Sequence, residues 1–361
     1  MSRIDALNEW VIRAQISAKQ RSKVYNNLAL LLESRVALYD ALDKLRDIHS
    51  LGGTKPNVPL AVMIDAWRSR IALGSKFATA IRDWVSPEEA ALIAAGERSG
   101  NLREAFNDAM RLIGAKSAIV MTIALGFAYP VFLAVLIAGV LTMIATMLVP
   151  VVARIVPPET WEGTAAILYA ISQYTLNYGI YTAVAIIAIV VLIVFSFPRL
   201  RGNLRYYLDR FPPWSIYRAV LGASFLLNVS VMVRAGVSLL DAVELLAKHA
   251  NPYLRERLDA TIQGIARGDN FGEALLSADY AFPDPEAIAM IRAIAVTEGF
   301  DLALTKFADE WLQEVTQRVR AAMAVIVVVG VLTAGSLTAL VAVSFFDIQE
   351  TIEAQTDSRY N

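Results

Sequence analysis

The amino-acid sequence predicts an all-α membrane protein with three transmembrane helices and two repeated helical-bundle domains. Three observations lead to this fold class: long stretches without charged residues, an asymmetry of charge at their ends, and a similarity between the two halves of the chain. No segment alternates polar and apolar residues long enough to indicate a strand. Of the 361 residues, 56% are hydrophobic and none is cysteine, which excludes disulfides and cysteine-ligated metals.

The longest uncharged stretch lies between Lys116 and Arg154. About 20 apolar residues are enough to cross a bilayer as a helix. A soluble helix of this length needs a polar face, which this stretch lacks. Two further uncharged stretches are long enough to cross as well. The predicted transmembrane helices are residues 118–152, 175–198 and 321–346.

Prolines mark the first transmembrane helix. Its most apolar part runs from Tyr129 to Val149, with Pro130 near the start and Pro150 at the end. Proline fits the first turn of a helix and stops a helix after its last turn. We therefore expect Pro130 to lie close to the start of this part and Pro150 to close the helix, with residues 117–128 either extending the helix toward the cytoplasm or lying at the interface.

Small residues recur at every fourth position in two of these helices, and no charged residue occurs inside any of them. Small side chains let membrane helices approach closely, although they are also common in membrane helices generally. Transporters coupled to ions usually carry ionisable groups in the membrane, so the uncharged helices argue against that class. The expected packing residues are Ala134, Ala138 and Thr142 in the first helix and Gly330, Ala334 and Thr338 in the third.

The charges at the helix ends predict the orientation. Lysine and arginine gather before the first helix, after the second and before the third, whereas the other ends are acidic or nearly uncharged. Cytoplasmic flanks are enriched in lysine and arginine. We therefore assign residues 1–20 to an N-terminal amphipathic segment with Ile4, Leu7 and Val11 on one side. The cytoplasmic helical domains are 21–117 and 199–320, and the periplasmic parts are the loop 153–174 and the tail 347–361.

The two cytoplasmic segments resemble each other. Residues 25–45 align with residues 224–246, and the similarity continues through Gly74 and Phe77, which align with Gly268 and Phe271. Each copy then shows a helix start of the form Ser/Asp-Pro-Glu, at residues 86–89 and 284–286.

One position of this repeat is expected to be strained in one copy. Gly236 lies at a helix–helix turn of the second copy, where a left-handed backbone suits glycine. The first copy has Arg35 there, so its turn must either differ or be strained.

Residues 90–109, AALIAAGERSGNLREAFNDA, resemble the Gly-Glu-x-Ser-Gly-x-Leu motif of the type II secretion F family. This family comprises inner-membrane platform proteins of type IV pili and type II secretion. The resemblance covers residues 20–346 and includes Tyr129-Pro130 and Pro150. The second copy keeps only Glu298 and Gly299 of the motif, which favours a divergent branch such as type IVb or plasmid-encoded pili. The motif residues are Gly96, Glu97, Ser99, Gly100 and Leu102, with Glu104 close by.

The resemblance implies a multi-pass protein of the bacterial inner membrane that couples a cytoplasmic hexameric ATPase to the extraction of pilins or pseudopilins and to pilus polymerisation. It also implies contacts with other inner-membrane assembly proteins and a homo-oligomer. We expect no enzymatic activity, cofactor or metal, and the net charge of −1 gives no reason to expect nucleic acid. The alternative class is a membrane channel or transporter subunit; a membrane-bound enzyme would need a site that the sequence does not show.

Three sets of residues are candidates for a ligand-binding, metal-binding or partner-binding site. Residues 111–117, RLIGAKS, lack the glycine-rich turn of a phosphate-binding loop. His49 and His249 lie near helix ends without further metal ligands around them.

Glu97 closes a helix, where a carboxylate opposes the helix dipole, so a compensating group is expected: Arg98, Arg103 or an amide of the Ser99-Gly100 turn. We hypothesise that the surface from Glu97 to Glu104 supports the ATPase contact, with a positive φ at Gly100. The alternative is that this turn only stabilises the bundle.

Overall fold

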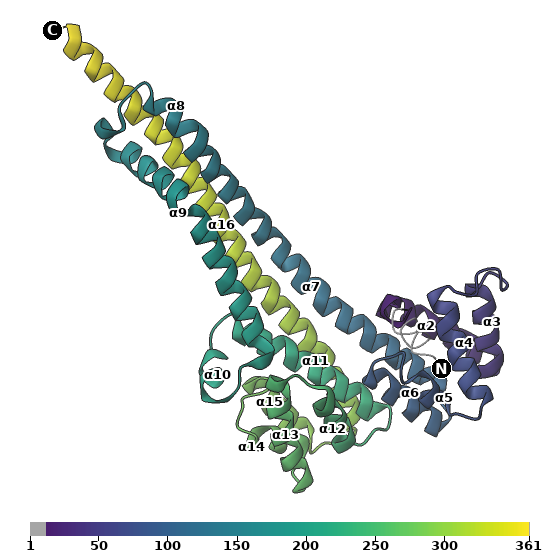
Figure 1. Ribbon diagram of the computed structural model, residues 1–361. Helices are drawn as coiled ribbons and strands as arrows, with labels where there is room; N and C mark the ends of the chain where they lie inside the picture. The colour runs from purple at the N-terminus through teal and green to yellow at the C-terminus, as the bar shows by residue number, and fades with distance from the viewer. Residues whose placement is uncertain (1–11, 361) are drawn as a thin grey trace. The chain divides into compact units, whose positions relative to one another are not determined.

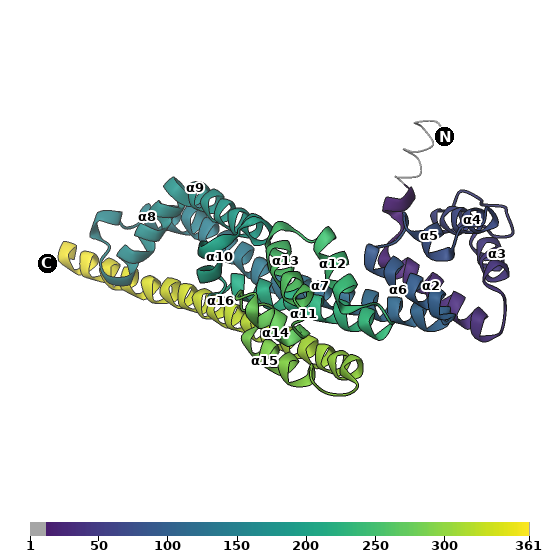
Figure 2. The ribbon, with the colours of Figure 1, turned by 90° about the horizontal axis from the view of Figure 1, so that it is seen from below.

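The computed structural model describes the backbone of residues 12–360 and the side chains of residues 12–350. Every regular element in that range is a helix (Figures 1 and 2). The chain divides into two compact units, one containing residues 12–120 and 197–316 and the other residues 121–196 and 317–360. Most of the predicted amphipathic segment, including Ile4, Leu7 and Val11, lies outside the described residues. Ser17 caps the first complete helix, so the predicted segment does not continue as one helix to residue 20.

The first half of unit one is a bundle around a cluster of four aromatic rings. Tyr25 stacks on Phe106 with ring centroids 5.6 Å apart, and Phe77 meets both Trp67 and Phe106 edge-on at 5.8 Å. All four side chains are buried, so they fix the helices that carry them. The helices are α2 (Ala18–Glu33), α3 (Leu38–His49), α4 (Pro59–Ala72), α5 (Phe77–Ile81), α6 (Pro87–Ser99) and the start of α7 (Leu102–Met143).

The second half of unit one forms a similar series of helices. Phe225 packs against Phe271 and Phe282 in its core, with centroids 6.1 and 5.5 Å away. Leu227, Val231 and other residues of this half join the core of the first half, so the two halves share apolar contacts. The helices are α10 (Gly202–Leu208), α11 (Trp214–Arg234), α12 (Leu239–His249), α13 (Pro252–Ala266), α14 (Phe271–Ser277), α15 (Pro285–Ile294) and the start of α16 (Phe300–Tyr360).

Among the described residues, four helices rather than the expected three are long and apolar enough to cross a membrane. The additional one is α11, which the sequence analysis placed inside the second helical domain. In α11, 56% of the most apolar window is buried within the protein, against 17% or less in the other three. Its length and composition therefore suit a membrane, but its apolar side chains already have protein neighbours.

The turns at Arg35 and Gly236 have the same backbone form. Both residues have positive φ, +61° at Arg35 and +86° at Gly236. The next N–H reaches five residues back in each turn: Val36 donates to Leu31 and Val237 to Met232, each at 3.0 Å. Of the two expected outcomes, the first copy therefore has the strained turn. A side chain in this region is disfavoured by roughly 1 kcal/mol.

In unit two, α7, α9 (Gly163–Arg199) and α16 lie side by side (Figures 1 and 2). A π-helical turn, Ile144–Leu148, joins α7 to α8 (Val149–Ala153) without a break. Residues 117–128 extend the helix, which is one of the two expected outcomes, so Pro130 does not mark its start, and the prediction that Pro150 closes the helix was wrong. Pro130 lies inside α7, and Pro150 lies in the first turn of α8, which continues to Ala153. The π-helical turn precedes Pro150, where the missing N–H would interrupt a regular α-helix.

The segment assigned to a loop, 153–174, is largely helical because α9 already begins at Gly163. Only a short link with one 3-10 turn, Pro158–Thr160, precedes it. The amide of Thr164 donates to the Asp347 carboxylate at 2.9 Å. Asp347 therefore caps α9 from the far end of α16, which is a favourable position for an anion.

Only part of the expected small-residue packing is present within the chain. A Cβ placed on Gly330 would lie 2.4 Å from Leu133, so α16 and α7 approach closely there. Ala334 is half-buried, but Ala134, Ala138, Thr142 and Thr338 are exposed. The face that packs inside the chain instead carries larger side chains, namely Leu133 and Val140 of α7 and Ile144 of the π-helical turn that follows it.

Candidate functional site: the motif groove

The motif residues form the turn between α6 and α7. Gly100 ends α6 in the left-handed region, with φ +74°, and the N–H of Asn101 donates to the Gly96 carbonyl at 2.8 Å. Asn101 then begins α7: its Oδ1 accepts from the Glu104 amide at 3.4 Å and its Nδ2 donates to the Glu104 carboxylate at 2.7 Å. The predicted positive φ at Gly100 is confirmed, and the Asn101 side chain caps the start of α7.

Gly96 is required for a different reason. It is buried where α6 crosses the start of α7, and a Cβ at this position would lie 2.3 Å from the Ala105 Cβ and 3.0 Å from the Asn101 carbonyl oxygen. Real Cβ atoms do not approach this closely. The glycine therefore sets the spacing between the two helices, whereas Gly100 sets the direction of the chain.

Glu97 binds none of the three groups proposed from the sequence. Its carboxylate accepts from the backbone amides of Phe77 at 2.7 Å and Ala78 at 3.1 Å, the first two residues of α5. The residue before α5 is Lys76, whose side chain makes no capping bond. Glu97 therefore satisfies the start of a different helix, where its negative charge is favourable.

The second half solves the same problem locally. There Asn270 precedes α14, and its side chain accepts from the Glu273 amide at 2.9 Å. In the aligned first half, Lys76 occupies the position of Asn270. The carboxylate of Glu97 thus replaces a cap that the first half lacks.

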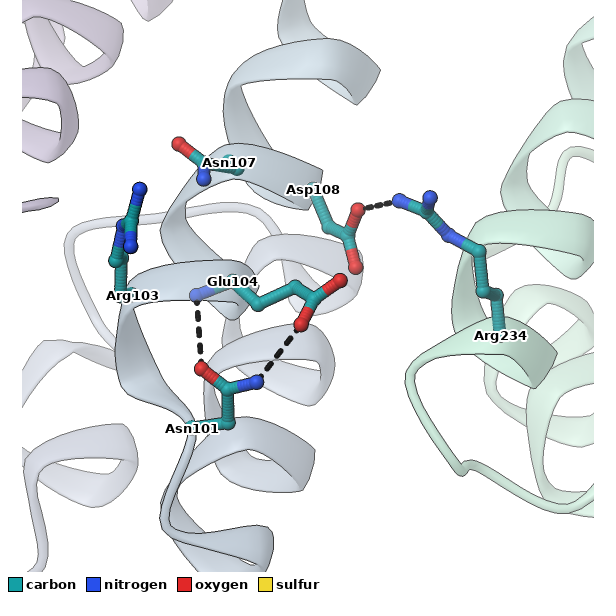
Figure 3. Close-up of a pocket in the computed structure, with 6 residues that line it drawn as sticks. All are labelled: Asn101, Arg103, Glu104, Asn107, Asp108 and Arg234. Atoms are coloured by element: carbon teal, nitrogen blue, oxygen red, sulfur yellow. Dashed lines mark hydrogen bonds and ion pairs between the residues drawn. The ribbon is translucent and has the colours of Figure 1, made fainter.

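Beside the motif turn is a polar groove, drawn in Figure 3. We call it the motif groove. Its larger part has a cavity volume of about 410 Å³. Asp108 is 3% exposed and forms an ion pair with Arg234 at the end of α11, as Figure 3 shows. Arg103, Glu104 and Asn107 are exposed on its rim. The lining residues are Gly96, Ser99, Asn101, Arg103, Glu104, Ala105, Asn107, Asp108, Arg234, Ala235 and Gly236.

The sequence analysis predicted the motif side of this groove but not Asp108 or Arg234. Asp108 lies between the buried residues Phe106 and Ala109 on α7. This position on the apolar side of the helix could have indicated that the carboxylate is buried. A carboxylate so placed needs a cation, because an unpaired buried charge is strongly unfavourable. Arg111 pairs with Asp309 of α16 one turn later on α7. Both ion pairs tie α7 to the second half of unit one.

A second buried polar contact lies inside the first half. Glu89, at 2% exposed, accepts two bonds from the Arg21 guanidinium, at 2.8 and 3.1 Å, and one from the Tyr25 hydroxyl at 2.8 Å. Burial and the Glu89 carboxylate raise the pKa of Tyr25 well above its ordinary value. From the sequence, Glu89 was expected only as part of the helix start at residues 86–89. Its backbone amide does donate to the Ser86 hydroxyl there, so Ser86 caps α6.

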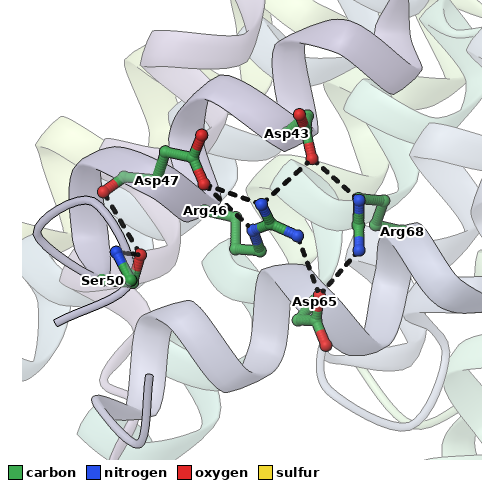
Figure 4. A network of polar contacts seen from close by, with 7 residues as sticks. Asp43, Arg46, Asp47, Ser50, Asp65 and Arg68 are labelled. Carbon is green, nitrogen blue, oxygen red and sulfur yellow. Dashed lines mark hydrogen bonds and ion pairs between the residues drawn. The ribbon is translucent and has the colours of Figure 1, made fainter. Parts of the chain in front are cut away.

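Figure 4 shows a charged network on the outer side of α3 and α4. Arg68 lies 2.8 Å from Asp43 and 3.3 Å from Asp65, and Arg46 lies 2.8 Å from Asp47. These side chains are between one quarter and about half exposed, so water and salt weaken the pairs. The network holds two neighbouring helices together without forming a ligand site.

Within the described residues, no group of three or more metal-ligating side chains comes together. Residues 111–117 are part of α7, so they form no phosphate-binding loop. His249 Nδ1 lies 3.1 Å from the Leu245 carbonyl in the last turn of α12, which agrees with the expected helix-end contact. His49 lies in the last turn of α3, where burial lowers the pKa of its imidazole.

These features describe a helical protein whose apolar helices fit several passes through a membrane. Its sequence matches the family described as "Type II secretion system (T2SS), protein F" over residues 24–150 and 225–346, well over half of the chain. The protein therefore belongs to this family, as the motif indicated.

Two curated relatives are similar over most of their length. The toxin coregulated pilus biosynthesis protein E of Vibrio cholerae is 22% identical over 298 residues, which cover 82% of this chain and 86% of that protein. The type IV pilus assembly protein PilC of Myxococcus xanthus is 24% identical over 309 residues, covering 82% of this chain and 72% of that protein.

Proposed function

We propose that this protein is an inner-membrane platform of a type IV pilus or type II secretion machine, which couples a cytoplasmic ATPase to the extraction of pilins or pseudopilins. The family match over both halves of the chain is the observation that carries this proposal. Both relatives are named for pilus biosynthesis or assembly. The continuity of α7 and α16 adds a physical reason. Each helix begins with a polar part and continues into an apolar one, so one element links a cytoplasmic segment to a membrane segment of the proposed topology.

We further propose three membrane passes, by residues 118–152, 175–198 and 321–346, with two repeated helical domains in the cytoplasm. Residues 153–174, which include the first turns of α9, and the C-terminus would then be periplasmic and the N-terminus cytoplasmic. The parallel order of helices and the matching turns at Arg35 and Gly236 support the repeat. The burial of α11, with Arg218 paired to Asp284 near its start, supports a place for α11 inside the second domain.

Reporter fusions test this topology and separate it from a four-pass arrangement. Alkaline phosphatase fused after Thr160 or Gln355 should be active, and fused after Lys55 or Ala260 it should be inactive. If α11 crosses the membrane, the fusion after Ala260 becomes active and the one after Gln355 becomes inactive. That pattern would overturn the proposed orientation of everything after residue 234.

The motif groove is our candidate for the contact with the ATPase. Gly96, Glu97 and Gly100 are occupied with helix spacing, capping and chain direction, so a partner would touch the rim instead. The rim presents Arg103 and Asn107, which are both exposed. The Arg103 guanidinium lies 3.0 Å from Glu33, in a pair about half exposed, so a partner carboxylate can compete for it at little energetic loss.

Charge reversal on the rim tests this contact. We expect Arg103→Glu and Asn107→Glu, which both place negative charge on the rim, to weaken capture of the partner ATPase by the full-length protein at least ten-fold while its thermal midpoint changes little. Lys306→Glu is the matched control, because Lys306 is an exposed cation of α16 outside the groove. Wild-type capture by both rim variants would exclude the groove as the contact and leave the motif with a structural role.

A further inference from the structure

Helix α10 has a buried face and an exposed face of very different character. It begins at Gly202, directly after α9, which ends at Arg199. Three Cα–Cα steps of 3.8 Å join these residues, so α10 starts within about 11 Å of the end of α9. The headgroup region of a bilayer extends about 5–8 Å beyond the hydrocarbon on each side. If residues 175–198 form the crossing, α9 leaves the hydrocarbon at its C-terminal end, and the chain holds α10 close to the membrane surface.

The buried face attaches α10 firmly to the second half of unit one. Arg205 is fully buried and lies 3.0 Å from Asp209, which in turn lies 3.0 Å from Arg257 of α13. Both guanidinium groups lie against the Tyr253 ring, that of Arg205 at 4.3 Å and that of Arg257 at 3.6 Å from its centroid. Its hydroxyl donates to Asp209 at 2.9 Å. These contacts fix the orientation of α10, so its other face is set toward the outside.

The exposed face combines arginines with large apolar side chains. Leu204, Tyr207 and Phe211 are 62%, 60% and 64% exposed. The Arg210 guanidinium lies over the rings of Tyr206 and Tyr207, at 5.3 and 5.4 Å. Within the described residues, neither Arg201 nor Arg210 is paired with a carboxylate. We name these residues the α10 patch: Arg201, Leu204, Tyr206, Tyr207, Arg210 and Phe211.

We propose that the α10 patch lies in the headgroup region of the membrane and binds the phosphates of anionic phospholipids. Tyrosines with apolar bodies and polar tips concentrate at this depth, and basic residues beside them attract anionic headgroups. Neither Arg201 nor Arg210 has a carboxylate partner in the part of the chain that the structure describes, and a guanidinium can bind phosphate through two parallel hydrogen bonds. The short connection to α9 keeps the patch beside the bilayer surface. We therefore assign lipid, rather than a soluble protein, as the ligand of the patch.

This inference rests on α9 crossing a membrane, which is part of the proposed topology, but it needs neither the ATPase nor pilins. It also holds for either orientation of the chain. The enrichment of cytoplasmic flanks in lysine and arginine would explain positive charge near Arg199. It would explain neither the exposed aromatic residues nor a preference for anionic lipid.

Lipid-dependent stability of the full-length protein in neutral detergent micelles is the first test. Phosphatidylglycerol should raise the thermal midpoint at lower concentration than phosphatidylcholine does. Each arginine near an anionic surface is worth about five-fold in affinity, so Arg201→Gln/Arg210→Gln should raise the phosphatidylglycerol midpoint concentration about 25-fold. Arg201→Lys/Arg210→Lys should keep the preference, and the exposed Arg267→Gln serves as the control. Equal effects of the two lipids on the wild-type protein would overturn the proposal.

A depth measurement distinguishes failure of this inference from failure of the topology. Because the chain lacks cysteine, Tyr207→Cys and Val190→Cys can each carry a single nitroxide label in vesicles containing phosphatidylglycerol. We expect the label at 190 deep in the hydrocarbon and the label at 207 at headgroup depth. A deep label at 190 with a fully aqueous label at 207 refutes the α10 patch alone. An aqueous label at 190 refutes the crossing of α9.

Discussion

Glu97→Ala should destabilise unit one by removing the cap of α5. The carboxylate accepts two backbone amides, at 2.7 and 3.1 Å, from residues that are 2% and 9% exposed. Without Glu97, both N–H groups are left without an acceptor in a largely dry environment. Each such group is unfavourable by about 1–3 kcal/mol, so a loss of about 2–4 kcal/mol is expected. For a unit of this size, the thermal midpoint should fall by roughly 5–10 °C.

The second half of the chain supplies the matched rescue. Lys76→Asn places at the start of α5 the residue type that caps α14, where Asn270 accepts from the third amide of the helix. An asparagine cap is worth about 1 kcal/mol. Lys76→Asn/Glu97→Ala should therefore recover roughly 2–4 °C of the loss. Thermal unfolding of the purified full-length protein, followed by circular dichroism, measures all three variants.

Two outcomes would refute this reasoning. If Glu97→Ala unfolds within 1 °C of the wild type, the carboxylate does not stabilise α5. If Lys76→Asn leaves the double variant unimproved while Glu97→Ala is destabilised, Glu97 acts through something other than the helix start. Glu97→Gln keeps one acceptor oxygen without the charge, so it should fall between the wild type and Glu97→Ala.

Three further predictions concern the same unit, each checked by thermal unfolding. Gly96→Ala should lower the free energy of unfolding by about 1–3 kcal/mol, because its Cβ overlaps α7. Gly100→Ala should lower it by about 1 kcal/mol, and Gly100→Asn by less, because asparagine tolerates positive φ. Equal thermal midpoints for the three variants would contradict this prediction. The pKa of His49 is lower in the folded protein than in the unfolded chain, where it is near 6.5. The neutral imidazole therefore contributes its full stability above pH 6.5, and that contribution is lost as the pH falls through the folded-state pKa. His49→Gln should therefore flatten the decline of the thermal midpoint between pH 7 and 5. Arg21→Ala should lower stability by about 3 kcal/mol because Glu89 is left buried without its cation, and Arg21→Ala/Glu89→Gln should recover part of that loss.

Local features of the fold could be predicted from the sequence because they depend on neighbours along the chain. Ser86 and Asp284 cap their helices, accepting from the amides of Glu89 and Glu286. Gly100 has its positive φ, and the strain at Arg35 followed from comparison with Gly236. Capping and left-handed turns involve residues within five positions, so composition and spacing are sufficient evidence for them.

Long-range partners could not be predicted in this way. Glu97 and the Phe77 amide that donates to it are 20 residues apart, and Arg21 and Glu89 are 68 apart. For Glu97, charged residues lay closer in sequence, so proximity favoured the wrong partner. The apolarity of α11 was equally ambiguous, because a buried core helix and a membrane helix have the same composition. The helix end predicted at Pro150 was wrong because a π-helical turn precedes the proline and lets the helix continue past it.

The roles of the motif residues affect how any loss of pilus assembly in motif variants should be interpreted. Gly96, Glu97 and Gly100 each have a structural task, so their substitution changes the shape of the motif groove before it changes any contact with a partner. Glu97→Ala by itself therefore cannot separate folding from coupling. The Lys76→Asn/Glu97→Ala variant can, because Lys76 lies outside the residues that line the groove. If this variant recovers stability and capture of the ATPase together, Glu97 acts only by supporting α5. If stability returns and capture does not, the carboxylate itself belongs to the coupling surface.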